Sequence, residues 1–222
     1  MRILLASSNP HKLREIRAVF GQTVAFELIG LEQLQRQIPQ PVEDRQTFEG
    51  NAALKAQYYA DAAGMHCLAD DSGLEVDALG GEPGVRSARY AGAIGAREAV
   101  DRAKNQLLLE RLGDLPAEQR TARFVCVMAL CEPGKTPPVA VVRGTVEGRI
   151  LTAAECGCGS TSGGLPGGGR GENGFGYDPI FLIPDLGKTA AELTPDQKNA
   201  ISHRGSAARK MRDRLVRLFP AD

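Results

Sequence analysis

The stretch around which this chain is organised runs from residue 67 to residue 77 and reads Cys67-Leu68-Ala69-Asp70-Asp71-Ser72-Gly73-Leu74-Glu75-Val76-Asp77. Its apolar start is typical of the end of a buried strand, and two carboxylates followed by serine and glycine are typical of the turn that leaves it. Neighbouring side chains on an extended backbone point to opposite faces, so we expect only one carboxylate to face a pocket and the other to cap or brace. The facing carboxylate can hold Mg2+ or take a proton from water; the alternative is an ordinary Asx turn that closes a strand.

Length and composition exclude several classes of protein. The chain has 222 residues, enough for one large domain or two small lobes, and its 27 basic and 27 acidic residues give a formal net charge of zero. No global charge therefore attracts nucleic acid or an anionic membrane.

The N-terminal apolar segment is too short for a signal peptide, and the apolar run 124–131 is far shorter than a membrane span. Five irregularly spaced cysteines favour a reducing compartment. We expect a soluble cytoplasmic protein with no nucleic-acid or membrane partner.

The N-terminus predicts a strand, a turn and a helix. Residues 2–6 are mostly apolar, and apolar residues recur at helical spacing after Ser7-Ser8-Asn9-Pro10-His11-Lys12. Asn9 suits the N-cap and Pro10 the first helical position. Backbone N–H groups and the helix dipole bind anions at such a helix start, and Lys12 adds a full charge. The alternative is an ordinary capped helix with a solvated lysine.

The next segment predicts a strand over 24–29, a loop over 32–46 and a helix from Thr47 to about Gly64. Glu43, just before that helix, is either a solvated loop charge or a second metal carboxylate. Lys55 lies at the edge of the apolar face of the helix, where it either snorkels to solvent or projects into a cleft.

Further along the chain we expect regular elements separated by glycine-rich segments. The predicted elements are a helix over 97–112, two buried neighbouring strands over 120–131 and 139–146, and a final helix whose core face carries Ala208, Met211, Leu215 and Leu218. A glycine-punctuated loop spans 78–92, and a flexible glycine-rich excursion spans 153–174. Cys156 and Cys158 within it lack a partnering pair and are weak evidence for zinc.

A second candidate site follows the glycine-rich excursion. Residues 174–181 combine flexible backbone with Phe175 and Tyr177, which we expect to be exposed, and with Asp178 before a proline. An aromatic side chain on such a turn can stack on a nucleobase, whereas the alternative is a hairpin whose aromatics pack in the core.

Together these segments resemble one family, the inosine and xanthosine triphosphate pyrophosphatases that clear non-standard purine nucleotides. The matching motifs appear in the order of the family: Ser7-x-Asn9-x-x-Lys12, Thr47-Phe48-x-x-Asn51-Ala52-x-x-Lys55-Ala56, Ala69 to Gly73, Leu79 to Gly84, Ser87-Ala88-Arg89-Tyr90, Phe175 to Phe181, and Lys198 with His203-Arg204. They cover the chain from Arg2 to Phe219. Two departures are Ser7 where the family usually has threonine, and a longer glycine-rich excursion before Phe175.

The resemblance implies an α/β fold with an elongated, long mixed β-sheet flanked by helices, in a single domain over 1–222 with two lobes and a central cleft, and with 153–174 as a glycine-rich loop insertion. It also implies a homodimer and Mg2+-dependent cleavage of ITP, dITP and XTP to the monophosphate and pyrophosphate. Asp71 would be the catalytic base and, with Glu43, a metal ligand. The substrate-binding residues would be Ser7, Ser8, Asn9, Pro10, His11, Lys12, Lys55, Ser72, Phe175, Gly176, Tyr177, Asp178, Lys198, His203 and Arg204.

The chemistry agrees with this assignment. Hydrolysis at the α-phosphorus needs a positioned water, a base and cations, which a carboxylate, Mg2+ and the lysines Lys12, Lys55 and Lys198 supply. Donors from His203 and Arg204 aimed at the purine carbonyl would accept hypoxanthine or xanthine and disfavour adenine. The alternatives are a related pyrophosphatase for modified pyrimidine nucleotides and a non-catalytic nucleotide or nucleic-acid binding module that uses the arginine-rich C-terminal helix.

Overall fold

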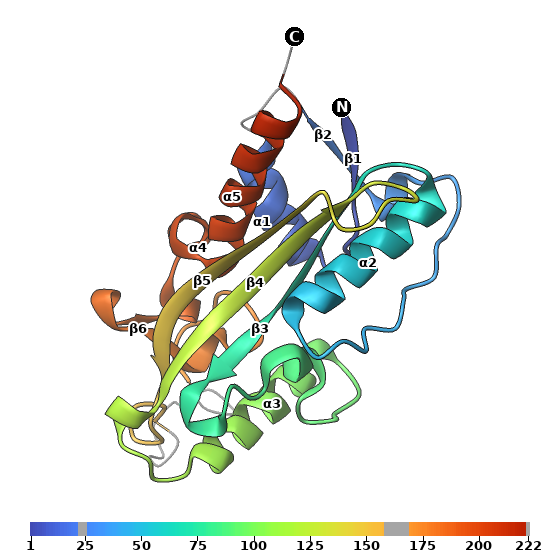
Figure 1. Cartoon of the computed structure of the whole chain (residues 1–222). Coiled ribbons are helices and arrows are strands. Elements are labelled where there is room, and N and C mark those ends of the chain that lie inside the picture. The colour runs from blue at the N-terminus through green and yellow to red at the C-terminus, as the bar shows by residue number, and fades with distance from the viewer. Residues whose placement is uncertain (22–25, 158–168, 221–222) are drawn as a thin grey trace. The chain divides into compact units, whose positions relative to one another are not determined.

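The computed structural model describes residues 1–21, 26–157 and 169–220. Its strands are β1 (Arg2–Leu5), β2 (Glu27–Gly30), β3 (Cys67–Val76), β4 (Thr121–Cys131), β5 (Ala140–Ile150), β6 (Phe181–Ile183) and β7 (Lys188–Thr189). Its α-helices are α1 (Pro10–Phe20), α2 (Phe48–Ala63), α3 (Arg97–Leu112), α4 (Pro195–Ile201) and α5 (His203–Leu218) (Figure 1).

Over the described ranges the strands form one seven-stranded sheet in the order β2-β1-β3-β4-β5-β6-β7. Strand β1 pairs in parallel with β2 and β3, whereas β6 pairs antiparallel with β5 and β7, so the sheet is mixed. The register places Leu5 opposite Leu68, and the Ala6 N–H donates to the Leu68 carbonyl at 2.9 Å. The turn after β1 therefore begins beside Asp70. The expected α/β fold with a long mixed sheet flanked by helices is confirmed.

The chain divides into two compact units, and the division falls within β3, β4 and β5. The first unit comprises Met1–Ser72, Val125–Thr145 and Ser202–Asp222, and the second comprises Gly73–Phe124 and Val146–Ile201. Each of the three strands thus contributes residues to both units. The predicted cleft between two lobes stays a prediction.

The core of the first unit lies between helices α1 and α5 and the strands of this unit. The two helices pack against each other (Figure 1). Fully or largely buried residues of this core include Ile3, Leu5, Ile16, Phe20, Leu68, Met128, Ala208, Met211 and Leu215. The predicted core face of the final helix is confirmed except at Leu218, which is 39% exposed because it lies in the last turn.

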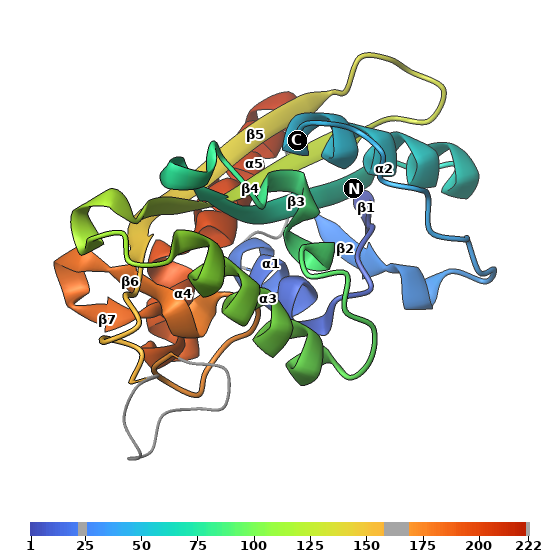
Figure 2. The ribbon, with the colours of Figure 1, turned by 90° about the horizontal axis from the view of Figure 1, so that it is seen from below.

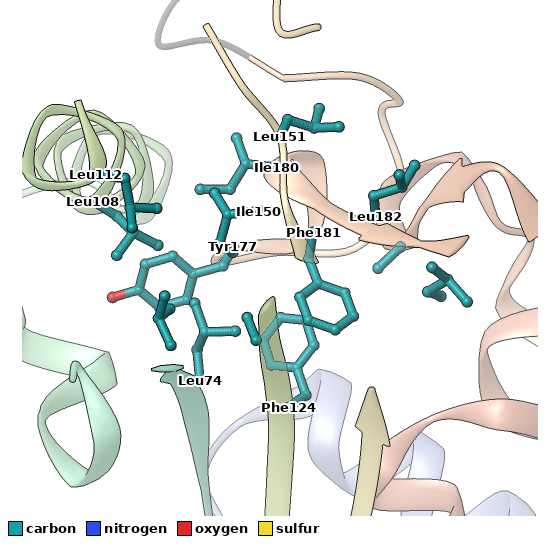
Figure 3. Packing of buried hydrophobic residues seen from close by; sticks show 14 of the residues in the cluster. Leu74, Leu108, Leu112, Phe124, Ile150, Leu151, Tyr177, Ile180, Phe181 and Leu182 are labelled. Carbon is teal, nitrogen blue, oxygen red and sulfur yellow. The ribbon is translucent and has the colours of Figure 1, made fainter. Parts of the chain in front are cut away.

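The core of the second unit joins α3 to β6 and to the segment before it (Figures 2 and 3). The rings of Phe124 and Phe181 lie with their centroids 4.5 Å apart. Leu108 and Leu112 of α3 pack in the same cluster as Tyr177. This packing contradicts the expectation that Tyr177 is exposed, since only 3% of the residue is accessible and its hydroxyl donates to the Ser87 carbonyl at 3.1 Å.

The prediction that a turn follows Asp70 and Asp71 is wrong. Both carboxylates lie inside β3, which continues to Val76 with Leu74 and Val76 buried. Gly73 is needed for close packing, because a Cβ atom there would lie 2.4 Å from Ser87 Oγ and 2.6 Å from the Gly84 carbonyl oxygen. Side chains that find polar partners can occupy a strand interior, and those partners could not be seen in the local sequence.

Most other element predictions are confirmed with shifted ends. The predicted helices begin at Pro10 and Phe48 and span Arg97–Leu112, with Thr47 as N-cap and Gly64 as C-cap of α2. Strand β5 continues four residues past the predicted end at residue 146. The loop 78–92 contains short 3-10 turns, and residues 24 and 25 of the predicted second strand lie outside the described ranges. Among the described helices, none is long and apolar enough to cross a membrane.

Candidate functional site

The predicted anion-binding turn leads from β1 into α1. Ser7 Oγ accepts a hydrogen bond from the Asn9 N–H at 3.2 Å, and the helix begins at Pro10 as expected. Lys12 in the first turn places its Nζ atom 2.7 Å from Asp70 Oδ2. The turn thus brings a cation to the carboxylate pair. The side chain of His11 lies outside what the structure describes.

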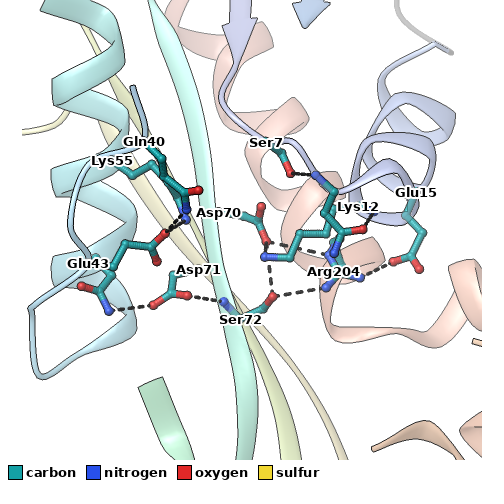
Figure 4. Close-up of polar contacts among 12 residues, drawn as sticks. Ser7, Lys12, Glu15, Gln40, Glu43, Lys55, Asp70, Asp71, Ser72 and Arg204 are labelled. Carbon is teal, nitrogen blue, oxygen red and sulfur yellow. Dashed lines mark hydrogen bonds and ion pairs between the residues drawn. The ribbon is translucent and has the colours of Figure 1, made fainter. Parts of the chain in front are cut away.

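Asp70 points to the side of β3 on which Lys12 and Arg204 lie (Figure 4). Besides Lys12, the Arg204 Nε atom lies 3.8 Å from its carboxylate, and the Ser72 hydroxyl donates to it at 3.3 Å. Burial by itself would raise the pKa of Asp70, but the charges of Lys12, Arg204 and Lys55 outweigh it and hold that pKa well below its usual range. Asp70 is therefore a firmly ionised and weakly basic carboxylate.

Asp71 points to the opposite side of the strand, as the alternation of side chains requires (Figure 4). Its carboxylate accepts hydrogen bonds from Asn51 Nδ2 at 3.1 Å and from the Ser72 N–H at 2.9 Å. In the part of the chain that the structure describes, no cationic group lies within 4.0 Å of it. Burial is the largest influence and raises the pKa of Asp71, against the lowering effect of Lys55, Lys12 and Asn51. Asp71 is thus the more basic of the two.

Asn51 holds Asp71 in place and was not predicted as a site residue. Its Oδ1 atom accepts the Arg45 N–H at 2.9 Å, so its amide nitrogen is the group turned to the Asp71 carboxylate. Asn51 is 1% exposed in the first turn of α2. The sequence signal was its place four residues before Lys55 on the same helix.

Glu43 and Lys55 form an ion pair beside this group. Their Oε1 and Nζ atoms lie 3.0 Å apart, with side-chain exposures of 19% and 10%. Burial lowers the pKa of Lys55, but the charges of Asp70, Glu43 and Asp71 outweigh it and raise that pKa. Lys55 therefore stays charged and paired with carboxylates instead of reaching solvent, and its projection into a cleft stays a prediction.

The side-chain oxygens present suit Mg2+ better than a metal ion whose ligands all come from the protein. Over the described residues there is no group of at least three His, Cys, Asp or Glu side chains arranged to hold a metal ion. Mg2+ is usually bound through one or two carboxylates together with waters and substrate phosphates. Asp71, a buried carboxylate hydrogen-bonded only to neutral groups among the contacts given above, with Glu43 as a second carboxylate, fits that requirement.

Arg204 connects α5 to both α1 and β3. Its Nη1 atom lies 2.5 Å from Glu15 Oε2, and its Nη2 atom donates to Ser72 Oγ at 3.2 Å. Burial lowers the pKa of Arg204, but Glu15 and Asp70 outweigh it and raise that pKa. Glu15 was not predicted as a site residue, although it lies three residues after Lys12 on the same face of a predicted helix.

The start of α5 is placed by a cap and by a close backbone approach. Ser202 Oγ accepts the Gly205 N–H at 3.0 Å, which caps the helix ahead of His203 and Arg204. A Cβ atom at Gly144 of β5 would lie 2.3 Å from the His203 carbonyl oxygen. His203 is 6% exposed at this packed end of the helix.

The residues predicted around Phe175 lie in the second unit. Asp178 Oδ2 accepts the Phe175 N–H at 2.7 Å and pairs with Lys198 Nζ at 2.5 Å. The Phe175 ring is half-buried, and the cations of Arg97 and Lys198 lie 4.6 and 5.1 Å from its centroid. Arg97 was not predicted. Phe175 is therefore partly accessible and its role in stacking stays a prediction, whereas Tyr177 belongs to the core.

The predicted site residues thus form two groups, each described within its own unit. Lys12, Lys55, Glu43, Asp71, Ser72 and Arg204 are brought together in the first unit, and Phe175, Asp178 and Lys198 in the second. Their assigned roles stay predictions.

Residues 158–168 of the glycine-rich insertion, and therefore Cys158, lie outside the described ranges. Cys156 is buried, as are Cys67, Cys126 and Cys131. Burial raises the pKa of the Cys131 thiol to about 11, which keeps it protonated.

Known proteins similar to this chain cover nearly its whole length. A model described as the Ham1 family matches residues 3–214. A dITP/XTP pyrophosphatase of Lactobacillus acidophilus is 44% identical over 99% of this chain and 98% of its own length, and one of Exiguobacterium sibiricum is 46% identical over 97% and 98%. The solved structure of a HAM1 protein from Coxiella burnetii superposes with a TM-score of 0.81 at 38% identity, covering 98% of this chain and 99% of that one.

Proposed function

This chain belongs to the Ham1 family, and from that membership and its site we propose that it is a pyrophosphatase of non-standard purine nucleoside triphosphates. It would cleave ITP, dITP and XTP to the monophosphate and pyrophosphate. The dITP/XTP pyrophosphatases to which it is similar carry that substrate class in their names. The observation that carries the mechanism is the unequal environment of two adjacent carboxylates, Asp70 and Asp71.

We assign the role of general base to Asp71. A base must be ionised and yet able to accept a proton, and its raised pKa makes Asp71 the better acceptor. Asn51 and the Ser72 N–H hold its carboxylate in one orientation. Asp71 would take the proton of a water whose oxygen forms a bond to the α-phosphorus. The bond from that phosphorus to the bridging oxygen would break, and pyrophosphate would leave with its electron pair.

Lys12 and Lys55 supply positive charge for the triphosphate. Both lysines are partly buried and already face carboxylates, so their ammonium groups are held in place before substrate binds. Lys198, which pairs with Asp178 in the second unit, would add a third cation. The turn from Ser7 to Lys12 offers backbone N–H groups at the start of α1.

We propose Mg2+ as the cofactor, held by Asp71 and Glu43. When bound, it neutralises charge on the phosphate oxygens during transfer. Lys55 already contacts Glu43 and would keep that carboxylate in place. Asp70 is less suited to this role, because Lys12 and Arg204 compensate its charge.

Recognition of the base is assigned to Phe175, His203 and Arg204. Phe175 offers a half-buried ring for stacking. Arg204 is fixed by Glu15 and Ser72, so its guanidinium would meet the purine carbonyl in one orientation. The predicted homodimer and cytoplasmic location are retained as proposals, and sedimentation of the purified protein tests the first.

A substrate panel tests the function. With Mg2+, pyrophosphate release from ITP, dITP and XTP should be much faster than from ATP, GTP or a modified pyrimidine triphosphate, and removal of the metal with EDTA should abolish it. Equal rates on all purines would refute the specificity, and phosphate as the product would refute the reaction. Faster release from the pyrimidine nucleotide would favour the related pyrimidine pyrophosphatase.

A further inference from the structure

In the second unit, one face of α3 binds the backbone of Gly176. Asp101 Oδ2 accepts the Gly176 N–H at 2.8 Å, and Asn105 Nδ2 donates to the Gly176 carbonyl oxygen at 3.0 Å. Asp101 and Asn105 are four residues apart and therefore neighbours on the helix surface. Both polar backbone groups of one residue are thus held by side chains of one helix.

Asp101 is itself fixed by a buried cation. Lys104, which is 6% exposed, places its Nζ atom 2.7 Å from Asp101 Oδ1 and 5.3 Å from the centroid of the Tyr177 ring. Burying an ammonium group is costly unless the charge is paired. Arg97 also lies 3.9 Å from Asp101 while its guanidinium lies over the Phe175 ring. The Asp101 carboxylate therefore connects the backbone of Gly176 with two cations, Lys104 and Arg97. These cations lie over the rings on either side of Gly176 in the sequence.

Asn105 is a poor choice if packing alone decides this position. It is 5% exposed, and within the described residues its Oδ1 atom is buried without a hydrogen-bond partner. A buried acceptor left unsatisfied is destabilising, whereas leucine has nearly the shape of asparagine and no polar atoms. What asparagine adds here is the bond to Gly176.

The orientation of Phe175 depends on the residue that follows it. Gly176 has a φ of 67°, the left-handed conformation that favours glycine. Tyr177 on its far side is anchored in the core through Ser87, and the Phe175 N–H is bound by Asp178. With Gly176 clamped at both polar groups, the backbone carrying the Phe175 ring has little freedom left.

We propose that Asp101 and Asn105 are positioning residues that hold Gly176 so that the Phe175 ring is a preformed stacking surface for the purine base. This inference rests on the proposed function. A preformed surface avoids the entropic cost of ordering the loop when a nucleotide binds. The clamp acts through the base and leaves the triphosphate groups untouched.

The test compares Asn105→Leu with Gln106→Leu, a neighbouring exposed position on the same helix. Loss of one hydrogen bond predicts a rise of about three- to tenfold in KM for ITP and in the calorimetric Kd for inosine monophosphate. The inhibition constant of tripolyphosphate, which has no base, should not change, and kcat should change little. The Tm of Asn105→Leu should stay close to that of Gln106→Leu, because removal of the unsatisfied Oδ1 acceptor offsets the lost hydrogen bond to Gly176.

Unchanged KM and Kd would overturn the proposal, as would a parallel rise for tripolyphosphate or a Tm well below that of Gln106→Leu. Binding of inosine monophosphate needs no turnover. A wild-type protein that binds it but cleaves no purine triphosphate would therefore refute the proposed function while the clamp is still tested. A wild-type protein that does not bind it would overturn the clamp.

Discussion

Replacing Asp70 or Asp71 by asparagine makes the same small change at adjacent residues of β3, and the structure predicts opposite results. Asp70→Asn should destabilise the protein strongly and affect turnover less. Asp71→Asn should leave stability nearly unchanged and lower turnover by at least two orders of magnitude, or about 10²-fold. Each variant is therefore the matched control of the other.

The loss at Asp70 follows from the cations left behind. Its carboxylate lies 2.7 Å from Lys12 Nζ, and both side chains are largely buried. At an effective dielectric constant of about 20, that distance corresponds to a gross attraction of about 6 kcal/mol. Desolvation offsets part of it, and removing one partner of a buried pair typically costs about 3–5 kcal/mol of unfolding free energy. For a chain of this size, that corresponds to a fall in Tm of about 6–20 °C.

A small effect on stability is expected at Asp71, because its replacement leaves no buried cation without its partner. Its raised pKa means that the ionised carboxylate is not stabilised by folding. Asparagine keeps an acceptor for the Ser72 N–H and loses one for Asn51, a change of about 1 kcal/mol. The expected shift in Tm is below about 4 °C.

Thermal unfolding at pH 7, followed by circular dichroism, measures the stabilities, and pyrophosphate release from ITP below both midpoints measures turnover. Loss of a general base predicts a fall of about 10²–10⁴-fold for Asp71→Asn, with nucleotide binding retained. Equal losses of Tm, or a larger loss for Asp71→Asn, would refute the assignment of the two environments. Retained turnover in Asp71→Asn would show that another residue is the base.

Two further predictions concern the second unit. The Arg149 guanidinium lowers the pKa of Glu155 from an ordinary 4.5 to about 2, so the stabilisation from this pair is fully present above pH 4.5 and is lost as the pH falls towards 2. The Tm difference between wild type and Glu155→Gln should therefore be constant from neutral pH to about pH 5 and disappear near pH 2. A Tm difference that does not depend on pH would contradict this. Gly73→Ala should lower the unfolding free energy by about 1–3 kcal/mol because the new methyl group meets Ser87 and the Gly84 backbone, and an unchanged urea midpoint would show that the strand can shift to accept it.

The helices could be predicted from the sequence because their signals are local. Thr47 and Gly64 mark the ends of α2 through capping geometry, and Asn9-Pro10 marks the start of α1. The sheet was harder to predict. The segment from Asp70 to Leu74 has the residues of a turn but lies in a strand, and its partners Lys12, Asn51 and Ser87 come from distant parts of the chain.

Phe175 and Tyr177 show the same contrast between local sequence signals and partners from distant parts of the chain. Local composition predicted two exposed aromatics, yet Tyr177 is buried because α3 supplies Leu108 and Leu112 to cover it. Glu15 and Arg97 were missed for a similar reason, since each meets its partner only through packing of a helix.

By itself, the sequence determined the family motifs, the helices and the presence of two adjacent carboxylates. Because side chains alternate along a strand, these two carboxylates must point to opposite sides of it. Only the tertiary structure decided which is which. Asp70 meets the cations of Lys12 and Arg204 and stays ionised, while Asp71 meets the amide of Asn51 and the Ser72 N–H and becomes more basic. The pKa of a carboxylate depends on burial and on charges brought near by folding, and neither is visible in the order of residues along the chain.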